Sequence, residues 1–69
     1  MDIAVVGTGY AGLVTGACLA DIGHHVTCID IDKEKIWKLN QGEVPFFEPG
    51  LSELVKKGVT KGKLNFSVA

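Results

Sequence analysis

The chain contains no arginine, and its seven cationic side chains are all lysines. These lysines fall mainly within residues 33–38 and 56–63, where acids are interleaved with them, a pattern typical of solvated helix faces. The formal net charge is −1 at pH 7. The charge distribution therefore indicates neither nucleic acid nor an acidic membrane surface as a partner.

Cysteine and long apolar runs are also scarce. Two cysteines are too few for the disulfide framework of a small secreted domain, and no signal peptide precedes the first apolar run, so we expect a cytoplasmic protein. The longest apolar stretches, residues 3–6 and 13–20, are far shorter than the ~20 residues of a membrane span. At 69 residues the chain is at most one small domain, with a core that buries only about 60% of the surface exposed on unfolding.

Three short segments predict β-strands. Residues 3–6 form a continuous apolar run, which is typical of a strand buried on both faces. Residues 26–30 form the second strand, with Asp30 at its carboxyl end. Alternation of apolar and polar residues within 63–68 predicts the third strand.

Helical patterns fill the segments between the strands, at residues 10–22, at residues 32–41 and from residue 49 onward. In the first pattern the small residues Gly12, Gly16 and Ala20 recur every four positions and would line one helix face. Gly23 is predicted to cap this helix, and Pro49 is predicted to occupy the first position of the third one.

The alternation of strands and helices predicts an α/β fold with a parallel sheet and right-handed crossovers. We expect residues 1–69 to form a partial Rossmann domain, the βαβαβ half of a doubly wound sheet, with strands in the order 3-2-1. The first helices would then cover a single face. Because an open face and free strand edges recruit other chains, we expect self-association or association with the rest of an enzyme.

A G-x-G-x-x-G run occupies residues 7–12. The run alone is a weak signal, but it directly follows a predicted strand and opens a helix, as the dinucleotide-binding fingerprint requires. Gly7 would make the tight turn, Gly9 would let the backbone approach a pyrophosphate, and Gly12 would bring helix and strand together. The helix amino terminus would bind the pyrophosphate through its unpaired N–H groups. The alternative is an ordinary strand-to-helix turn.

Asp30 follows Gly7 by 23 positions (30 minus 7), where this fold places the carboxylate that accepts both adenine-ribose hydroxyls. A carboxylate there repels a 2′-phosphate, which favours NAD over NADP. Lys33 and Lys35 are nearby cations that weaken this preference, while the lack of arginine supports it. The alternative is an exposed acid at a strand end.

Three other residues have open or modest roles. Thr8 is expected to contribute its backbone to the cofactor. Tyr10 either covers the cofactor or packs beside the helix. Trp37 is expected to be a packing residue of the second helix.

Beyond the glycine loop, the order of motifs resembles the opening of the UDP-glucose/GDP-mannose dehydrogenase family, closest to its UDP-glucose dehydrogenases, over residues 1–69. The first block of this resemblance is Gly7-Thr8-Gly9-Tyr10, Gly12-Leu13-Val14, Gly23-His24 and Cys28-Ile29-Asp30-Ile31-Asp32. The second block, which a generic Rossmann domain would not share, is Asn40-Gln41-Gly42, Pro45 and Glu48-Pro49-Gly50-Leu51.

The resemblance implies NAD as the cofactor and the twofold oxidation of a nucleotide sugar's primary alcohol to a uronate. It implies cofactor contacts at Gly7, Thr8, Gly9, Tyr10, Ala11, Gly12, Asp30 and Lys35. Lys35 matches a family position near the adenosine end. Ala11 stands where family members usually carry valine, a change that a backbone contact would survive.

The resemblance places the family's nucleophilic cysteine and sugar-binding residues in later segments, and nothing in this chain matches their motifs. Cys18 and Cys28 are expected to be small buried side chains without a catalytic role. His24 and His25 are expected at the surface, without the further ligands that a metal site needs. The chain alone is therefore predicted to be inactive.

Two other functions fit the motifs. The first is the FAD-binding βαβ unit of a flavoprotein, whose longer fingerprint is matched by Gly7, Gly9, Gly12, Gly16, Gly23 and Val26. Flavoproteins more often end the second strand with glutamate. The second is a non-catalytic NAD-binding module.

Overall fold

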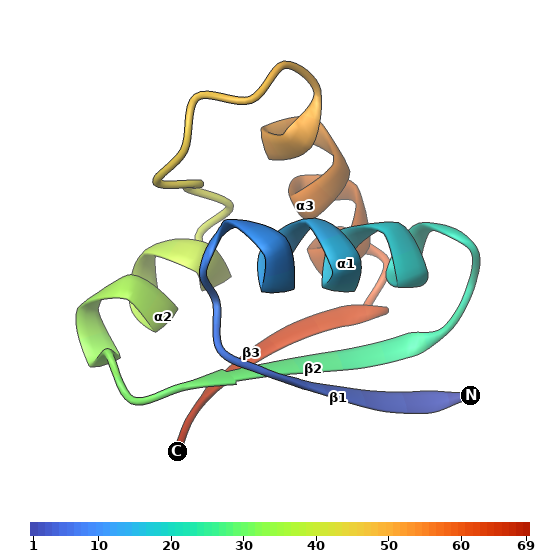
Figure 1. Ribbon diagram of the computed structural model, residues 1–69. Coiled ribbons are helices and arrows are strands. Elements are labelled where there is room, and N and C mark those ends of the chain that lie inside the picture. Colours follow the sequence, from blue (N-terminus) through green and yellow to red (C-terminus); the bar gives the residue numbers. More distant parts are fainter.

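The computed structural model describes all 69 residues. It contains three strands and three helices. Their order is β1 (Asp2–Val6), α1 (Tyr10–Asp21), β2 (His25–Asp30), α2 (Lys33–Asn40), α3 (Leu51–Thr60) and β3 (Leu64–Val68) (Figure 1). The strands are parallel, and β2 lies between β1 and β3. The predicted α/β half-sheet and its strand order are confirmed. None of the three helices has both the length and the apolar character that a bilayer crossing requires.

All three helices lie on one face of the sheet (Figure 1). The strand residues beneath them are buried in register, with Val26 beside Leu64 and Cys28 beside Phe66. The helices contribute the rest of a continuous apolar core, namely Leu13, Ala17, Ala20, Ile36, Leu39, Leu51 and Val55. The core is therefore a single layer between one sheet face and three helices.

The opposite face of the sheet is open (Figure 1), as the predicted topology requires, so the interpretation of the apolar run as a strand buried on both faces is wrong for this chain. Ile3 and Val5 pack against the core, whereas Val6 is 85% exposed and Ala4 is also exposed. Successive side chains of a strand point to opposite faces, so only one set can reach the helices. Because residues 3–6 are all apolar, β1 also places apolar side chains on the open face.

Glycine sets how closely α1 approaches the sheet. A Cβ atom added at Gly16 would lie 2.7 Å from the Sγ atom of Cys28 and 3.6 Å from Cγ1 of Val26. Gly58 plays the same part for α3, where an added Cβ would lie 2.9 Å from Cβ of Leu64. The predicted small-residue face of α1 is thus the face that contacts β2.

Gly23 ends α1 as predicted: it directly follows the cap residue Ile22 in a left-handed conformation, with a φ of 109°, that suits glycine after a helix end. Two other predicted details of the helices are wrong. Helix α3 begins at Leu51, so Pro49 lies before the capping residue rather than at the first helical position. Trp37 is 62% exposed because Ile36 and Leu39 form the buried side of α2.

We predict that Gly16→Ala destabilises the fold by roughly 1 to 2 kcal/mol, although alanine favours helix by about 1 kcal/mol. The added methyl group would press on the buried Cys28 thiol. Urea unfolding followed by circular dichroism measures the change. The double variant with Cys28→Ala should recover part of the loss, because the opposing sulfur is gone. Cys18→Ala, at an exposed site of the same helix, is the control. Additive losses in the double variant would contradict the contact.

Candidate dinucleotide site

The loop from β1 to α1 turns sharply at Gly7. Its φ of 95° lies in the left-handed region that side chains disfavour, and its N–H donates to the carbonyl oxygen of Ile29 at 2.7 Å. The glycine thus ends β1 while the loop stays bonded to β2. This geometry places residues 7–12 at the carboxyl ends of two adjacent strands.

The other two glycines of the fingerprint, Gly9 and Gly12, keep the space beside the loop backbone free of side chains. A Cβ atom at Gly12 would overlap the carbonyl oxygen of Gly7, so α1 can begin this close to the turn only with glycine there. A Cβ atom at Gly9 would meet nothing within 4 Å. Gly9 caps α1 without any side-chain hydrogen bond, and the first turn carries no acid. No side chain of the loop therefore caps the first N–H groups of α1, which are the groups that an anion at a helix amino terminus contacts.

Asp30 lies at the end of β2 beside this loop. Its Oδ2 atom accepts hydrogen bonds from the Thr8 hydroxyl at 2.5 Å and from the Thr8 N–H at 2.9 Å. Its Oδ1 atom accepts one from the N–H of Asp32 at 3.2 Å. The Thr8 hydroxyl, followed by these backbone donors, holds the pKa of Asp30 well below its usual range. The carboxylate stays ionised at physiological pH.

Thr8 contributes more than the backbone contact expected for it. The residue is fully buried, and its hydroxyl is hydrogen-bonded to Asp30. A G-x-G loop gives no signal for this bond, because the x position specifies no side chain. The signal in the sequence that could have pointed to it is a residue with a hydroxyl group, Thr8, directly after Gly7. In the structure the N–H of Gly7 is bonded to β2.

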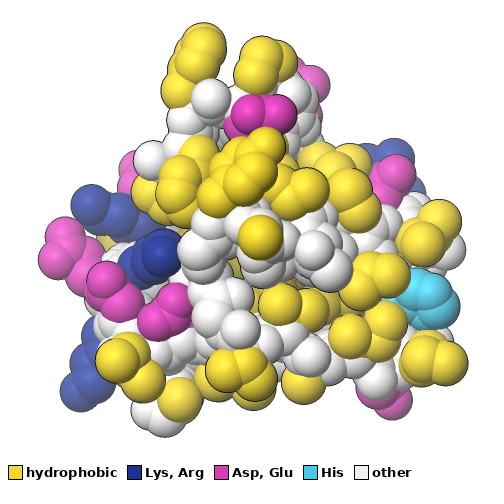
Figure 2. Space-filling view, in the orientation of Figure 1, with side chains coloured by type: hydrophobic (Ala, Val, Ile, Leu, Met, Phe, Trp, Pro, Cys, Tyr) yellow, Lys and Arg dark blue, Asp and Glu magenta, His cyan; other side chains and the backbone are white.

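Lys35 joins the same site from α2. Its Nζ atom lies 4.0 Å from Oδ2 of Asp30 and 6.0 Å from the ring centre of Phe46. It also borders a groove of about 380 Å³ that is lined by Lys35, Lys38, Glu43, Val44 and Pro45. Charged side chains of both signs gather over α2 in Figure 2. The structure thus brings together the loop, Asp30 and Lys35 from three separate segments.

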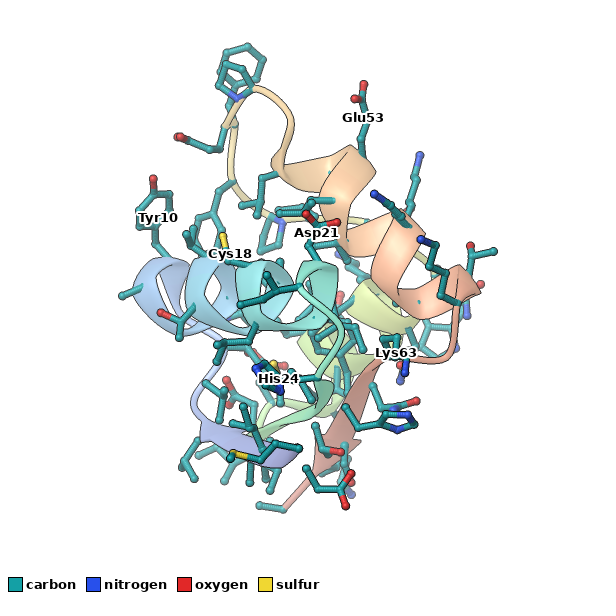
Figure 3. All side chains as sticks on the ribbon, turned by 90° about the vertical axis from the view of Figure 1, so that its right-hand side faces the viewer. Tyr10, Cys18, Asp21, His24, Glu53 and Lys63 are labelled. Atoms are coloured by element: carbon teal, nitrogen blue, oxygen red, sulfur yellow. The ribbon has the colours of Figure 1, made fainter.

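Tyr10 lies between the glycine loop and the segment that joins α2 to α3. Its ring meets that of Phe46 edge to face, with centres 5.7 Å apart and planes at 83°. The side chain points away from the sheet, toward the connecting segment (Figure 3). The negative charge of Glu48 raises the pKa of the Tyr10 hydroxyl. Sequence reasoning missed Phe46, because no motif links positions 10 and 46.

The cysteines and histidines lie apart from this site. Cys28 is buried in β2, and burial raises the pKa of its thiol to about 11. Cys18 is exposed, which corrects the expectation that it is buried; it leaves α1 on the side away from the sheet (Figure 3). His24 is half-buried in the turn between α1 and β2 (Figure 3), and His25 is exposed at the start of β2. No group of three or more metal-ligating side chains gathers anywhere in the chain.

A parallel half-sheet, a glycine turn that opens a helix and an ionised acid at the next strand end together define a dinucleotide-binding Rossmann unit. The model of the UDP-glucose/GDP-mannose dehydrogenase family NAD binding domain matches residues 1–69, and the chain belongs to that family. The expectation that NAD is the cofactor is thereby confirmed.

Known proteins of this family are similar over nearly the whole chain. UDP-glucose 6-dehydrogenase YwqF of Bacillus subtilis (strain 168) is 58% identical over 69 residues, which are 100% of this chain and 16% of that protein. The UDP-glucose 6-dehydrogenase of Rhizobium meliloti (strain 1021) is 52% identical over 67 residues, covering 97% of this chain and 15% of that protein. The chain therefore spans only about one sixth of the length of these relatives.

Solved structures agree with the fold. A ternary complex of GDP-mannose dehydrogenase from Pseudomonas aeruginosa superposes with a TM-score of 0.92 at 41% identity, over 96% of this chain and 15% of that one. UDP-D-ManNAc dehydrogenase from Pyrococcus horikoshii superposes with a TM-score of 0.95 at 38% identity, over 100% of this chain and 16% of that one.

We predict that Asp30→Asn lowers the free energy of unfolding near pH 7 and that its effect shrinks as the solution becomes acidic. The folded pKa of Asp30 lies below the unfolded value of about 3.9, so its stabilisation is full above that pH and is lost as the pH falls through the folded pKa. Urea unfolding at several pH values checks this. Asp2→Asn, at the other end of the sheet, controls for the change in net charge. A constant difference across the acid range would contradict it.

Proposed function

We propose that this chain binds NAD through its adenosine diphosphate half. The pyrophosphate lies at the amino terminus of α1 and the adenine ribose lies at Asp30. The observation that carries this proposal is the convergence of an uncapped helix start and an ionised carboxylate at the carboxyl ends of β1 and β2. The open space beside Gly9 admits a ligand next to the backbone there.

The electrostatics of the two halves of the site are opposite. No side-chain cation is needed at the pyrophosphate, because the helix dipole and free N–H groups already attract an anion. The negative charge of Asp30 disfavours a 2′-phosphate, which supports NAD over NADP. Lys35 is close enough to Asp30 to donate to a ribose oxygen, and it completes the proposed adenosine end.

For the longer protein we propose an NAD-dependent oxidation of a nucleotide sugar, of the UDP-glucose to UDP-glucuronate type. The identity to two UDP-glucose 6-dehydrogenases supports this proposal. The two free cysteines, Cys18 and Cys28, support a reducing, cytoplasmic compartment. The bound nicotinamide supplies hydride acceptance, while residues 1–69 bind and orient the adenosine end. Catalytic and sugar-binding residues come from other segments in this proposal.

Neither alternative function has a specific observation in its favour. The matched family domain binds NAD, and β2 ends with Asp30 rather than the glutamate more usual in flavoproteins. A non-catalytic NAD-binding module would share every feature of the site. Only assays of activity separate that module from a part of an enzyme.

We predict that Asp30→Ala weakens NAD binding roughly tenfold or more, because a charged acceptor of a ribose hydroxyl is removed. Isothermal titration calorimetry on both proteins measures the effect. Asp2→Ala removes one carboxylate at the amino end of β1, remote from the site, and should leave the affinity unchanged. Equal affinities in the wild type and Asp30→Ala would exclude the proposed ribose site.

We predict that the 69-residue chain forms no NADH from UDP-glucose or GDP-mannose. Its two thiols, Cys28 in the sheet and Cys18 on the outer side of α1, lie apart from the proposed site. Absorbance at 340 nm is the measurement. Turnover that disappears in Cys18→Ala or Cys28→Ala would show that one of these thiols is a nucleophile.

We predict that the isolated chain self-associates through the uncovered sheet face. This face exposes Ala4 and Val6 beside the unpaired edge of β1, but polar side chains such as Asn65 lie across it, so the association should be weak. Sedimentation equilibrium over a range of concentrations measures it. Val6→Lys should favour the monomer. A 7.3 kDa monomer at all concentrations would contradict the prediction.

A further inference from the structure

The Asp30 carboxylate is held by the chain itself. A carboxylate offers about four positions for hydrogen-bond donors. Two positions on Oδ2 accept from Thr8, and one on Oδ1 accepts from the N–H of Asp32. The N–H of Ile31 also lowers the pKa of Asp30, but it makes no hydrogen bond of standard geometry, so one position, on Oδ1, is left for a further donor. This arrangement differs from the expected one, in which Asp30 accepts both ribose hydroxyls.

Thr8 connects the two parts of the proposed site. It follows Gly7 in the glycine loop, yet its hydroxyl is directed to the end of β2, 22 positions later in the sequence. The residue has no exposed surface, so its hydroxyl is shielded from a pyrophosphate outside the helix start. Its only side-chain hydrogen bond joins it to Asp30.

We propose that Thr8 is a positioning residue for the adenine ribose. Its hydroxyl and N–H both donate hydrogen bonds to Oδ2 of Asp30. Oδ1 is then the atom that accepts a ribose hydroxyl. This inference rests on the proposed NAD site and adds a specific role within it.

The physical advantage is preorganisation. A free aspartate side chain loses rotamer freedom when it binds a ligand, and that loss weakens the binding. Here the carboxylate is fixed in advance by two donors from one buried residue. The charged groups that face it are the Lys35 ammonium, 4.0 Å from Oδ2, and the neighbouring Asp32, whose side chain instead caps α2. Neither replaces the Thr8 hydroxyl on Oδ2.

The test compares ADP with 2′,3′-dideoxy-ADP, which lacks the ribose hydroxyls but keeps the pyrophosphate. Calorimetry with the wild type should show ADP binding roughly tenfold more tightly. Thr8→Val keeps the shape of the side chain and removes the hydroxyl. It should reduce this preference to within about threefold and leave the affinity for dideoxy-ADP unchanged. Thr8→Ser should restore the preference.

The outcomes separate the two proposals. If the wild type and Asp30→Asn both fail to distinguish the two ligands, the proposed ribose site is wrong. If the wild type distinguishes them, Asp30→Asn does not, and Thr8→Val distinguishes them as well as the wild type, the site stands and the role of Thr8 is overturned. An equal loss of both ligands in Thr8→Val would show a merely structural role.

A second measurement needs no destabilising variant. In wild-type protein with ¹³C-labelled aspartate, the Asp30 carboxyl carbon should stay in its ionised position well below the pH of about 3.9 at which a free aspartate titrates. Thr8→Ser should behave in the same way. A titration midpoint near 3.9 in the wild type would show that Thr8 does not hold the carboxylate, and it would overturn the inference.

Discussion

The close approach of α1 to the sheet is the constraint on which the rest of this structure depends. At Gly12 the helix lies against the turn that begins it, and at Gly16 it lies against the sulfur of Cys28. Side chains at either position would lift the helix from β2. Because the glycine loop connects β1 to this helix, the same displacement would move Thr8 away from Asp30. The packing of the core and the geometry of the site therefore have one cause.

The electrostatic design of the site follows from backbone groups more than from charged side chains. The loop brings no cation to the start of α1, and the helix terminus provides the attraction for an anion. The acid at the end of β2 is likewise kept ionised by a hydroxyl and by N–H groups ahead of any cation. Such donors are neutral and fixed, so they hold a carboxylate without neutralising it. Asp30 keeps its negative charge for the discrimination against a 2′-phosphate that we propose.

Most of the fold could be predicted because periodicity and glycine spacing are local signals. The βαβαβ order, the strand order and the place of the glycine loop follow from runs of a few residues and from the rules of parallel sheets. The errors arise where tertiary context decides. The apolar run of β1, taken alone, predicts burial on both faces, and only the topology predicted that the helices cover a single face. The pattern of α2 cannot show that Trp37 lies outside the buried stripe.

The candidate site divides in the same way. Asp30 and the glycine loop were predictable because the fold fixes their separation along the chain. The Thr8 hydroxyl and the Phe46 ring were not, because their partners lie 22 and 36 positions away and no spacing rule connects them. Lys35 was predicted as a cation near Asp30 from the sequence and as a cofactor contact from its family position, and the structure supplies its physical setting beside Asp30.

The central place of β2 has a consequence for how the chain opens. Its carboxyl end is bonded on both sides, since the Ile29 carbonyl accepts from Gly7 and the Asp30 carbonyl accepts from Ala69. Fraying of either outer strand breaks only one of these bonds. Amide hydrogen exchange should therefore be slowest along β2, and the acid at its end belongs to the last part of the sheet to come apart. The proposed contact with the ribose thus lies at the end of the most persistent strand, while the proposed contacts with the pyrophosphate lie on a loop at the sheet edge.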